Sequence, residues 1–254
     1  MTRASNSTQP VWDREALRNP HQREDKAGRV RRMFDAIAGS YERVNRVASL
    51  GQDARWRRRT IAAAEVRAGD VVLDLCCGTG DMLREFAADS PTPRLAIGVD
   101  FARQMLARGK YDSAAPALLR GDALRIPLRD ASVDVITCAF GVRNFQSLQG
   151  GLNEMARVLR PGGRVCILEF CEPENALLRW AHRTYCNSVL PRIGTWLSGD
   201  RSGAYRYLPQ SIATFEPIAV LVRRLEDAGF SQVGVSRMNF GGVALYRGVR
   251  AAGH

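Results

Sequence analysis

The sequence has few of the residues that would mark a metal-binding or disulfide-stabilised protein. Only three histidines occur, and none of the six cysteines is spaced as a C-x-x-C pair. A zinc site is therefore not predicted, and no other metal site is expected. With 254 residues, the chain is long enough to bury a core without cross-links. Since the cysteines stand mostly in apolar runs, we interpret them as reduced, buried thiols.

Long hydrophobic runs are also missing. No stretch approaches the roughly 18 apolar residues of a membrane-spanning helix, and the N-terminus lacks the apolar core of a secretory signal. The sequence contains no internal repeat and no low-complexity tract. We therefore expect a cytoplasmic globular protein.

Acidic residues are scarce relative to basic ones. Thirty-seven lysines and arginines stand against 26 acidic residues, which gives a net charge of +11 and an isoelectric point near 10.0. Such a charge allows nucleic acid, an anionic membrane surface or acidic ligands as partners. The arginines are scattered over predicted helices, however, which favours a diffuse solvated face. No strand interleaves basic residues with stacking aromatics, so nucleic acid is not expected, and an RNA-acting enzyme stays an alternative on charge alone.

The chain is organised around a strand, a glycine turn and a helix. Val71–Leu75 is a short apolar run with β-branched residues, typical of a buried strand. Gly78-Thr79-Gly80 is a tight turn at which the backbone can approach a ligand closely. Asp81–Ala88 has helical spacing and an acidic residue in its first turn. In an open α/β sheet, a small molecule binds at the carboxyl end of such a strand.

The residues around this turn indicate which ligand it holds. A dinucleotide site needs a third glycine, but Leu83 occupies that position. Asp100 ends the next apolar run, where a carboxylate would accept both hydroxyls of a ribose. Asp74 lies nearer the turn and would help to hold a cationic amino-acid group. A ribose and an ammonium without a phosphate describe S-adenosyl-L-methionine; an ordinary tight turn without a ligand is the alternative.

Two later strand ends carry further candidate residues. Asp122 follows a short strand at 117–119, where a carboxylate can accept the amino hydrogens of an adenine ring. An aspartate that only begins a turn is the alternative. Arg143 and Asn144 follow a strand at 132–140, which would place two strong hydrogen-bonding side chains above the sheet. Loops in this position carry binding and catalytic residues more often than other segments do.

The alternation of strands and helices predicts the fold class. It implies an α/β protein with a parallel sheet and helices on both faces. Two late strands separated by a short turn indicate an antiparallel hairpin at one edge. The expected strands are 71–75, 95–100, 117–119, 132–140, 164–170, 233–238 and 242–249.

The parts of the chain outside the sheet have different compositions. Residues 1–28 are polar and mixed in charge, and we expect a flexible tail there, followed by a single domain at 29–250. At about 173–212, large apolar residues alternate with arginines, which predicts a helical insert. Such an insert covers a pocket or leans on a membrane surface, with ordinary core packing as the alternative. Tyr41 and Asn45 are four residues apart and share one face of a predicted helix.

On these residues, the chain resembles the S-adenosylmethionine-dependent methyltransferases of the Rossmann-like class. Several stretches are similar, more specifically, to the quinone C-methyltransferases of the UbiE/COQ5 family, and together they span about Val30 to Arg247. These stretches are Met33–Ala38 with Tyr41 and Asn45, Phe140–Phe145, Leu168–Phe170, Leu190–Gly194, Tyr205–Leu208 and Gly241–Leu245.

The resemblance implies a class I methyltransferase fold, S-adenosyl-L-methionine as cofactor and a polyprenylated quinol as substrate. A ring carbon would be methylated, with demethylmenaquinol as the expected acceptor and a ubiquinone precursor or another small hydrophobic molecule as alternatives. Because the acceptor's tail is a lipid, peripheral contact with the inner face of an anionic membrane is also implied. A homodimer is left open. The resemblance places the donor on Asp74, Gly78, Thr79, Gly80, Asp100, Asp122 and Ala123.

The implied reaction assigns roles to three further residues. The enzyme must align the ring carbon with the donor and stabilise the phenolate that forms when the neighbouring hydroxyl loses its proton. Arg143 suits the second task because its charge is permanent and its donors are forked. Asn144 would donate alongside it, and Tyr41 would close over the site and relay a proton. A salt bridge is the alternative role for Arg143, and a fold that serves only as an adaptor is the alternative to an enzyme.

Overall fold

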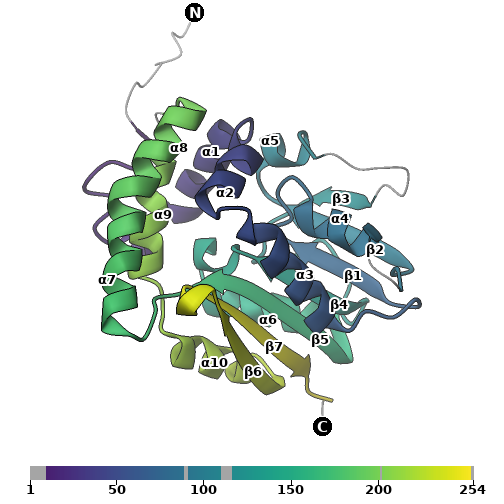
Figure 1. Cartoon of the computed structure of the whole chain (residues 1–254). Helices are drawn as coiled ribbons and strands as arrows, with labels where there is room; N and C mark the ends of the chain where they lie inside the picture. Colours follow the sequence, from purple (N-terminus) through teal and green to yellow (C-terminus); the bar gives the residue numbers. More distant parts are fainter. Residues whose placement is uncertain (1–9, 89–90, 110–115, 201, 253–254) are drawn as a thin grey trace, which may run out of the picture.

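The computed structural model describes residues 10–88, 91–109, 116–200 and 202–252. Within these ranges, seven strands form one sheet in the order β3-β2-β1-β4-β5-β7-β6 (Figure 1). The strands are β1 (Val71–Leu75), β2 (Leu95–Asp100), β3 (Ala117–Arg120), β4 (Val133–Ala139), β5 (Leu159–Phe170), β6 (Phe230–Met238) and β7 (Val243–Arg250). β1 to β5 are parallel, whereas β7 runs antiparallel to both β5 and β6. The predicted α/β fold with an antiparallel edge is confirmed.

The sheet is covered by helices on both faces. The covering helices are α3 (Gln52–Ala64), α4 (Asp81–Ala88), α6 (Leu148–Val158) and α10 (Ile218–Asp227). All five residues of β1 are buried, as expected for a central strand in such an arrangement. Leu73 and Leu75 pack with residues of α6 and α10, while Val72 packs on the opposite face with residues of α3 and α4.

The strand order reverses at the centre of the sheet. From β1 the order continues to β2 and β3, and from β4 it continues to β5. In open α/β sheets, this reversal leaves a crevice at the carboxyl ends of the strands. The glycine turn follows β1, and the short helix η2 (Val142–Asn144) follows β4, so both flank the crevice.

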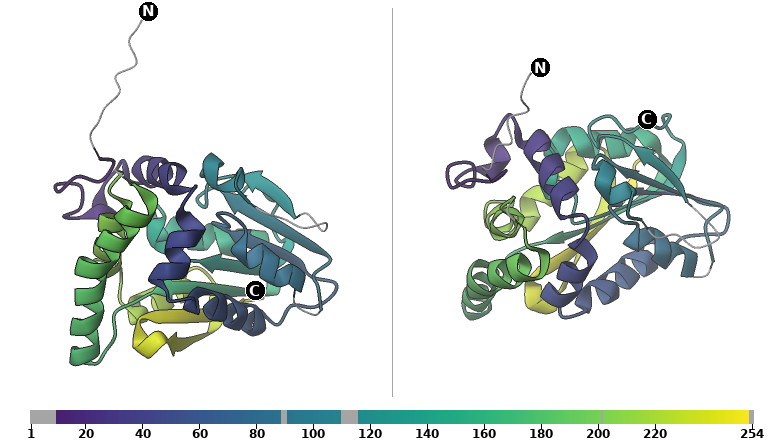
Figure 2. Two further views of the ribbon diagram at one scale, coloured as in Figure 1. Left: turned by 45° about the horizontal axis from the view of Figure 1, so that its top comes forward. Right: turned by 90° about the horizontal axis from the view of Figure 1, so that it is seen from above.

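A second group of helices gathers beside the sheet and forms a cap (Figures 1 and 2). Its members are η1 (Pro20–Gln22), α1 (Lys26–Ile37), α2 (Tyr41–Ala48), α7 (Ala176–Thr184), η3 (Tyr185–Val189), α8 (Leu190–Ser198) and α9 (Ala204–Ala213). η3 is a π-helix that joins α7 and α8 into one long rod, drawn in green in Figure 1. The segment predicted as a helical insert thus supplies the rod and α9. The remaining short helices are α5 (Arg103–Leu106) and η4 (Asn239–Gly241).

The predicted flexible tail is wrong for residues 10–28, which pack against the cap. Trp12 is fully buried, and its ring stacks on Tyr207 with 4.3 Å between the centroids. Ala16 is buried in the same cluster. The polar composition concealed this packing, because hydrogen bonds to distant residues also hold the segment, such as that from the Trp12 N–H to the Ser202 carbonyl at 3.1 Å. Residues 1–9 lie outside the described residues.

Candidate functional site

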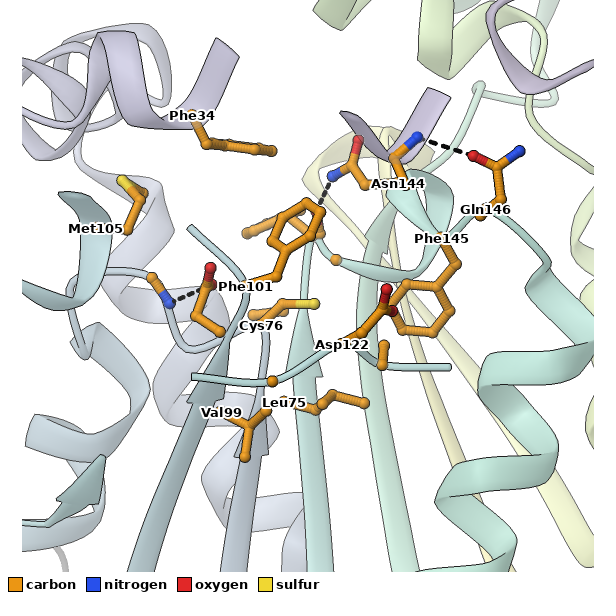
Figure 3. A pocket seen from close by; sticks show the side chains of 18 of the residues that line it. Phe34, Leu75, Cys76, Val99, Phe101, Met105, Asp122, Asn144, Phe145 and Gln146 are labelled. Atoms are coloured by element: carbon orange, nitrogen blue, oxygen red, sulfur yellow. Dashed lines mark hydrogen bonds between the residues drawn. The ribbon is translucent and has the colours of Figure 1, made fainter. Parts of the chain in front are cut away.

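A narrow cavity lies at the carboxyl ends of β1, β2 and β4, where the crevice opens. We call it the glycine-turn cavity, because Gly78 and Asp100 stand in its wall. Figure 3 shows Phe34 and Met105 on one side of it and Asp122 on the other. Strand ends, a glycine turn and three separate loops therefore build this space.

The glycine turn has a backbone that brings it close to Asp100. Gly78 and Gly80 have positive φ angles of 56° and 83°, a conformation that glycine adopts at low cost. Cys76 also has a φ of 60°, which strains a residue that carries a side chain. This geometry lets the Gly78 N–H donate to Asp100 Oδ2 at 2.9 Å. The turn and the carboxylate are thus held as one unit.

Asp100 is held in this cavity by two backbone N–H donors. Its side chain is buried, and its two oxygens accept N–H groups from Gly78 and from Ala102, at 2.9 and 2.8 Å. Burial raises the pKa of Asp100 to about 6, so the carboxylate is ionised at neutral pH. Each oxygen keeps a lone pair, which allows the side chain to accept two hydroxyl groups of a ribose.

Asp74 lies in β1, before the glycine turn, and does not line the cavity. It is buried, and the Thr137 hydroxyl donates to its Oδ1 at 2.8 Å. Burial raises the pKa of Asp74 to about 7. Because Asp74 is not among the residues that line the cavity, its direct contact with the ammonium of a donor stays a prediction.

Two observations show that this site fits S-adenosyl-L-methionine. Thr79 is only 3% exposed, and its hydroxyl has no hydrogen-bond partner among the described residues, which is rare for a buried polar group. Asp122 is exposed, with Oδ1 accepting the Leu124 N–H at 2.9 Å. Two acidic residues, Asp100 and Asp122, line the cavity and favour a cationic ligand. A ribose with a sulfonium and an ammonium group meets these requirements.

The predicted donor residues divide into two groups. Those that line the cavity are Gly78, Asp100, Asp122 and Ala123. Those outside its lining are Asp74, Thr79 and Gly80. For the second group, direct contact with the donor stays a prediction.

The aromatic wall of this cavity was not predicted. Phe34, Phe101 and Phe145 line it together with the polar residues, and apolar planar walls suit an adenine ring. The sequence held a signal for two of them. Phe101 directly follows Asp100, and Phe145 directly follows Asn144, so an apolar residue stands next to a predicted polar one in each case.

A second cavity of about 510 Å³ lies between the sheet and the cap. We call it the cap cavity. It meets the glycine-turn cavity at Phe34, Tyr41 and Phe140, which line both spaces. Its lining is mainly apolar and comes from α1, α2, α3, α7, η3, α9 and η4, segments far apart in the sequence. Its size and lining suit a ring system that carries a hydrocarbon chain.

Arg143 lines the cap cavity from η2 and is held by a buried ion pair. Its Nη1 donates to Glu169 Oε1 at 2.5 Å and to the Phe140 carbonyl at 3.0 Å. Its guanidinium also lies 5.4 Å from the centroid of the Phe170 ring. The salt bridge considered for Arg143 is therefore present. Because Nη2 donates no hydrogen bond to a described residue, it stays available to a ligand.

Asn144 lines the glycine-turn cavity and is fixed by two hydrogen bonds. The Tyr207 hydroxyl donates to Asn144 Oδ1 at 2.9 Å, and Asn144 Nδ2 donates to the Phe140 carbonyl at 3.2 Å (Figure 3). Burial raises the pKa of Tyr207, so its phenol keeps the proton that it donates. Arg143 and Asn144 share the Phe140 carbonyl as acceptor, which places both beside the junction of the two cavities.

Tyr41 stands at the junction itself. It begins α2, lines both cavities and meets Phe34 edge-on, with 5.9 Å between the ring centroids. Burial raises the pKa of Tyr41, so it is a neutral phenol at pH 7. Asn45 lines the cap cavity from the next helical turn. The structure therefore brings the three predicted catalytic residues to one place.

A histidine and a cysteine in the cap cavity were not predicted. His182 and Cys186 lie one turn apart, with Cys186 Sγ 3.6 Å from His182 Nε2. Burial lowers the pKa of His182 and raises that of Cys186 to about 11, so both are neutral at pH 7. A neutral imidazole in this cavity can accept a proton. The spacing of four residues on a predicted helix was the available signal.

Two negative findings concern the described residues alone. No group of three or more metal-ligating side chains is found there. Within the same ranges, every helix is too short or too polar to cross a bilayer.

Sequence comparison with known proteins gives a consistent family match. A model of the ubiE/COQ5 methyltransferase family matches residues 22–250. A demethylmenaquinone methyltransferase from Deinococcus radiodurans is 43% identical over 212 residues, which cover 82% of this chain and 87% of that protein. A protein of the same name from Thermus thermophilus is 40% identical over 222 residues, which cover 86% of this chain and 100% of that protein.

Solved structures with a similar fold have much lower sequence identity. A SAM-dependent methyltransferase from Thermotoga maritima has a TM-score of 0.61 and 16% identity, and the match covers 86% of this chain and 98% of that one. A SAM-dependent methyltransferase from Aquifex aeolicus has a TM-score of 0.58 and 17% identity over 83% of this chain and 98% of that one. At these identities, the similarity shows the Rossmann-like fold alone.

Proposed function

The chain belongs to the ubiE/COQ5 methyltransferase family, and from this premise we propose that it transfers a methyl group from S-adenosyl-L-methionine to a ring carbon of demethylmenaquinol, in menaquinone biosynthesis. The names of its relatives support a naphthoquinol over the benzoquinol of a ubiquinone precursor. The observation that carries the proposal is the junction of the two cavities. One fits the donor and the other fits an apolar ring with a chain, and they meet at Phe34, Tyr41 and Phe140.

The donor is held by the glycine turn and its surroundings. Asp100 accepts the ribose hydroxyls, Asp122 and Ala123 border the adenine, and the unpartnered Thr79 hydroxyl takes a polar group of the amino-acid portion. When bound, S-adenosyl-L-methionine supplies an electrophilic methyl group on a cationic sulfur. The carboxylates around the turn offset that positive charge, and the aromatic wall keeps water from the site.

The acceptor is activated by the residues at the junction. The quinol hydroxyl beside the reacting carbon gives up its proton, and Nη2 of Arg143 donates to the oxyanion that forms. Glu169 holds the guanidinium in place for this contact, since it fixes Nη1. Asn144 donates the second hydrogen of its amide from a position set by Tyr207.

The proton leaves through a neutral group. Tyr41 has a raised pKa, which makes it a relay between the quinol and a water molecule rather than a base in its own right. An arginine is a poor base because it stays charged. His182 lines the same cavity in its neutral form and is a second possible acceptor for the proton.

The acceptor's lipid tail also bears on where the enzyme works. We infer a protein on the cytoplasmic side of the inner membrane that contacts an anionic bilayer peripherally. The net charge of +11 supports such contact. A homodimer stays a prediction.

The proposed function is tested by methyl transfer from labelled S-adenosyl-L-methionine to two extracted acceptors, demethylmenaquinol and a demethylated ubiquinol precursor. We expect label on the naphthoquinol. Label on the benzoquinol alone would overturn the proposed pathway, and label on both would mean a dual-purpose enzyme.

A parallel binding measurement separates the remaining explanations. Calorimetric titration with S-adenosyl-L-methionine should show donor binding. Donor binding without label on either quinol would contradict the quinone proposal. Failure to bind the donor would instead favour the adaptor interpretation, and RNA binding that weakens steeply with salt would favour an RNA enzyme.

A further inference from the structure

Three segments from distant parts of the sequence surround the outer end of the cap cavity. The loop between α2 and α3, the helix α7 and the short helix η4 all contribute lining residues. Tyr185 donates to the Ala48 carbonyl at 2.8 Å, which ties the rod to the end of α2. A Cβ on Gly242 would lie 3.4 Å from His182, so η4 reaches the rod on the other side. These contacts define a mouth between the three segments.

Each segment presents a large apolar side chain at the mouth. Leu50, Leu178 and Phe240 line the cap cavity and yet are exposed, Leu50 at 84% and Phe240 at 83%. Leu50 and Phe240 also have left-handed backbones, with φ angles of 52° and 53°. Such strain in residues with side chains tends to persist where it serves a function. The loop between α2 and α3 and the short helix η4 thus each place an exposed apolar side chain at the rim of the cap cavity.

The outer face of α7 extends this apolar rim. Leu177 is 71% exposed and Trp180 is 65% exposed, and neither lines the cavity. They are three residues apart, so they lie on one helical face. Tryptophan is enriched where proteins meet the interface of a bilayer, because its ring is amphipathic.

Basic residues outnumber acidic ones on the helices that flank the rim. Tyr41–Ala64 holds six arginines and two acidic residues, and Ala176–Ser198 holds three arginines and no acidic residue. The two acidic residues are already paired within the protein, Glu42 with Arg84 and Asp53 with Arg57. The exposed arginines of α2 and α3 form no ion pair with another described residue; they are Arg43, Arg46, Arg55, Arg58 and Arg59. Beside α7, Glu172 pairs with Arg183 and Glu174 with Arg237. The rim is therefore apolar at its centre, and the helices that flank it carry an excess of positive charge.

We propose that this rim, formed by Leu50, Leu177, Leu178, Trp180 and Phe240, docks on an anionic lipid bilayer with the cap cavity open toward the hydrocarbon. The inference rests on the proposed function, because a lipid-tailed acceptor is what would pass from the bilayer into the cavity. Apolar side chains enter the interface, and the surrounding arginines meet anionic headgroups. A second copy of the chain fits less well, because in a two-fold dimer through this rim the same arginines would face one another.

The test is cosedimentation of the full chain with vesicles. One set contains equal parts of phosphatidylglycerol and phosphatidylcholine, and the other contains phosphatidylcholine alone. We expect binding to the anionic vesicles only. Leu177→Ser with Trp180→Ser should weaken that binding about tenfold, because two interfacial side chains are lost.

Matched controls use exposed residues at the opposite end of the sheet. Leu95→Ser removes an exposed apolar side chain at the start of β2, and this variant should bind vesicles as the unmodified chain does. Arg46→Gln with Arg55→Gln should weaken binding to anionic vesicles, whereas Arg129→Gln should have no effect. Loss of binding in Leu95→Ser or Arg129→Gln, or no loss in the two rim double variants, would overturn the proposal.

Two further measurements distinguish a failure of the docking proposal from a failure of the proposed function. Methyl transfer to a short naphthoquinol without a tail should be the same for the Leu177→Ser, Trp180→Ser variant, since neither residue lines the cavity. If the unmodified chain methylates this acceptor but ignores anionic vesicles, docking is wrong and the proposed function stands. If light scattering shows a dimer that the rim variant dissociates, the partner of the rim is a second copy of the chain and not a bilayer.

Discussion

The two cavities that meet at Tyr41 are built in different ways. The glycine-turn cavity rests on strand ends and backbone, and its main polar group, Asp100, is fixed by two N–H donors. The cap cavity is lined by side chains from α1 to η4, and most of its lining surface is apolar. The glycine-turn cavity therefore depends mainly on the sheet, whereas the cap cavity depends on how the helices pack. Donor binding and acceptor binding should therefore be separable by mutation.

The largest expected effect loosens the cap. Trp12 is buried against Tyr207 and other cap residues, so Trp12→Ala should lower the free energy of unfolding by about 4 kcal/mol. Urea denaturation measures this loss. Trp196→Ala, which removes an exposed tryptophan, should change stability by less than about 0.5 kcal/mol. If the folded Trp12→Ala variant also loses affinity for S-adenosyl-L-methionine, donor binding and acceptor binding are not separable by mutation.

The next effect concerns catalysis at the junction. Arg143→Ala should lower kcat about 100- to 1,000-fold, because one donor to the oxyanion is lost, while the Kd for S-adenosyl-L-methionine stays unchanged. The single variant also leaves Glu169 buried without its partner, which costs stability. Arg143→Met with Glu169→Gln avoids that problem and should show the same loss of kcat. Normal turnover by the double variant would remove Arg143 from the mechanism.

A substitution of Asp100 tests donor binding in the glycine-turn cavity. Asp100→Asn should raise the Kd for S-adenosyl-L-methionine about 100-fold, because two hydrogen bonds to an ionised acceptor are weakened. Isothermal titration calorimetry measures the change. Asp130→Asn removes the same charge at an exposed position and should leave the Kd as it was. Equal Kd values for the two variants would exclude Asp100 as the ribose acceptor.

A smaller effect follows from the titration of Asp100. Its pKa is raised by folding from 3.8 to about 6, so donor affinity should fall about tenfold between pH 7 and pH 5. The folded state binds this proton more readily than the unfolded state, so the contribution of Asp100 to stability grows as the pH falls through this range. Weaker donor binding at pH 5 is therefore not caused by unfolding through Asp100. Calorimetry at several pH values should give a flat profile for Asp100→Asn; a flat profile for the unmodified chain would contradict the assignment.

The smallest effect returns to the cap. Tyr185→Phe removes the hydrogen bond to the Ala48 carbonyl, which contributes about 1 kcal/mol. The rod should then sit less firmly beside α2, and KM for a tail-bearing quinol should rise about fivefold. Steady-state kinetics with tailed and short acceptors measures this difference. An equal rise for both acceptors would mean that the rod does not select for the tail.

The same division explains what could be predicted from the sequence. The strand Val71–Leu75, the glycine turn and Asp100 lie within about thirty residues, so local propensity and turn chemistry suffice to find them. The burial of Trp12 depends on Tyr207, far along the chain, and no local pattern encodes such a contact. Asp74 shows an intermediate case. Its place in the first strand is as predicted, and Thr137 on the neighbouring strand donates to one of its oxygens, a contact that no local pattern encodes.

The measurement that tests the account most directly is the position of the transferred methyl group. S-adenosyl-L-methionine with a carbon-13 methyl group is incubated with the enzyme and demethylmenaquinol, and the product is analysed by NMR. The meeting of the two cavities beside Arg143 predicts that the label is bonded to a ring carbon next to the hydroxyl. Label on the oxygen, or no labelled quinol while the donor is bound, would contradict the account.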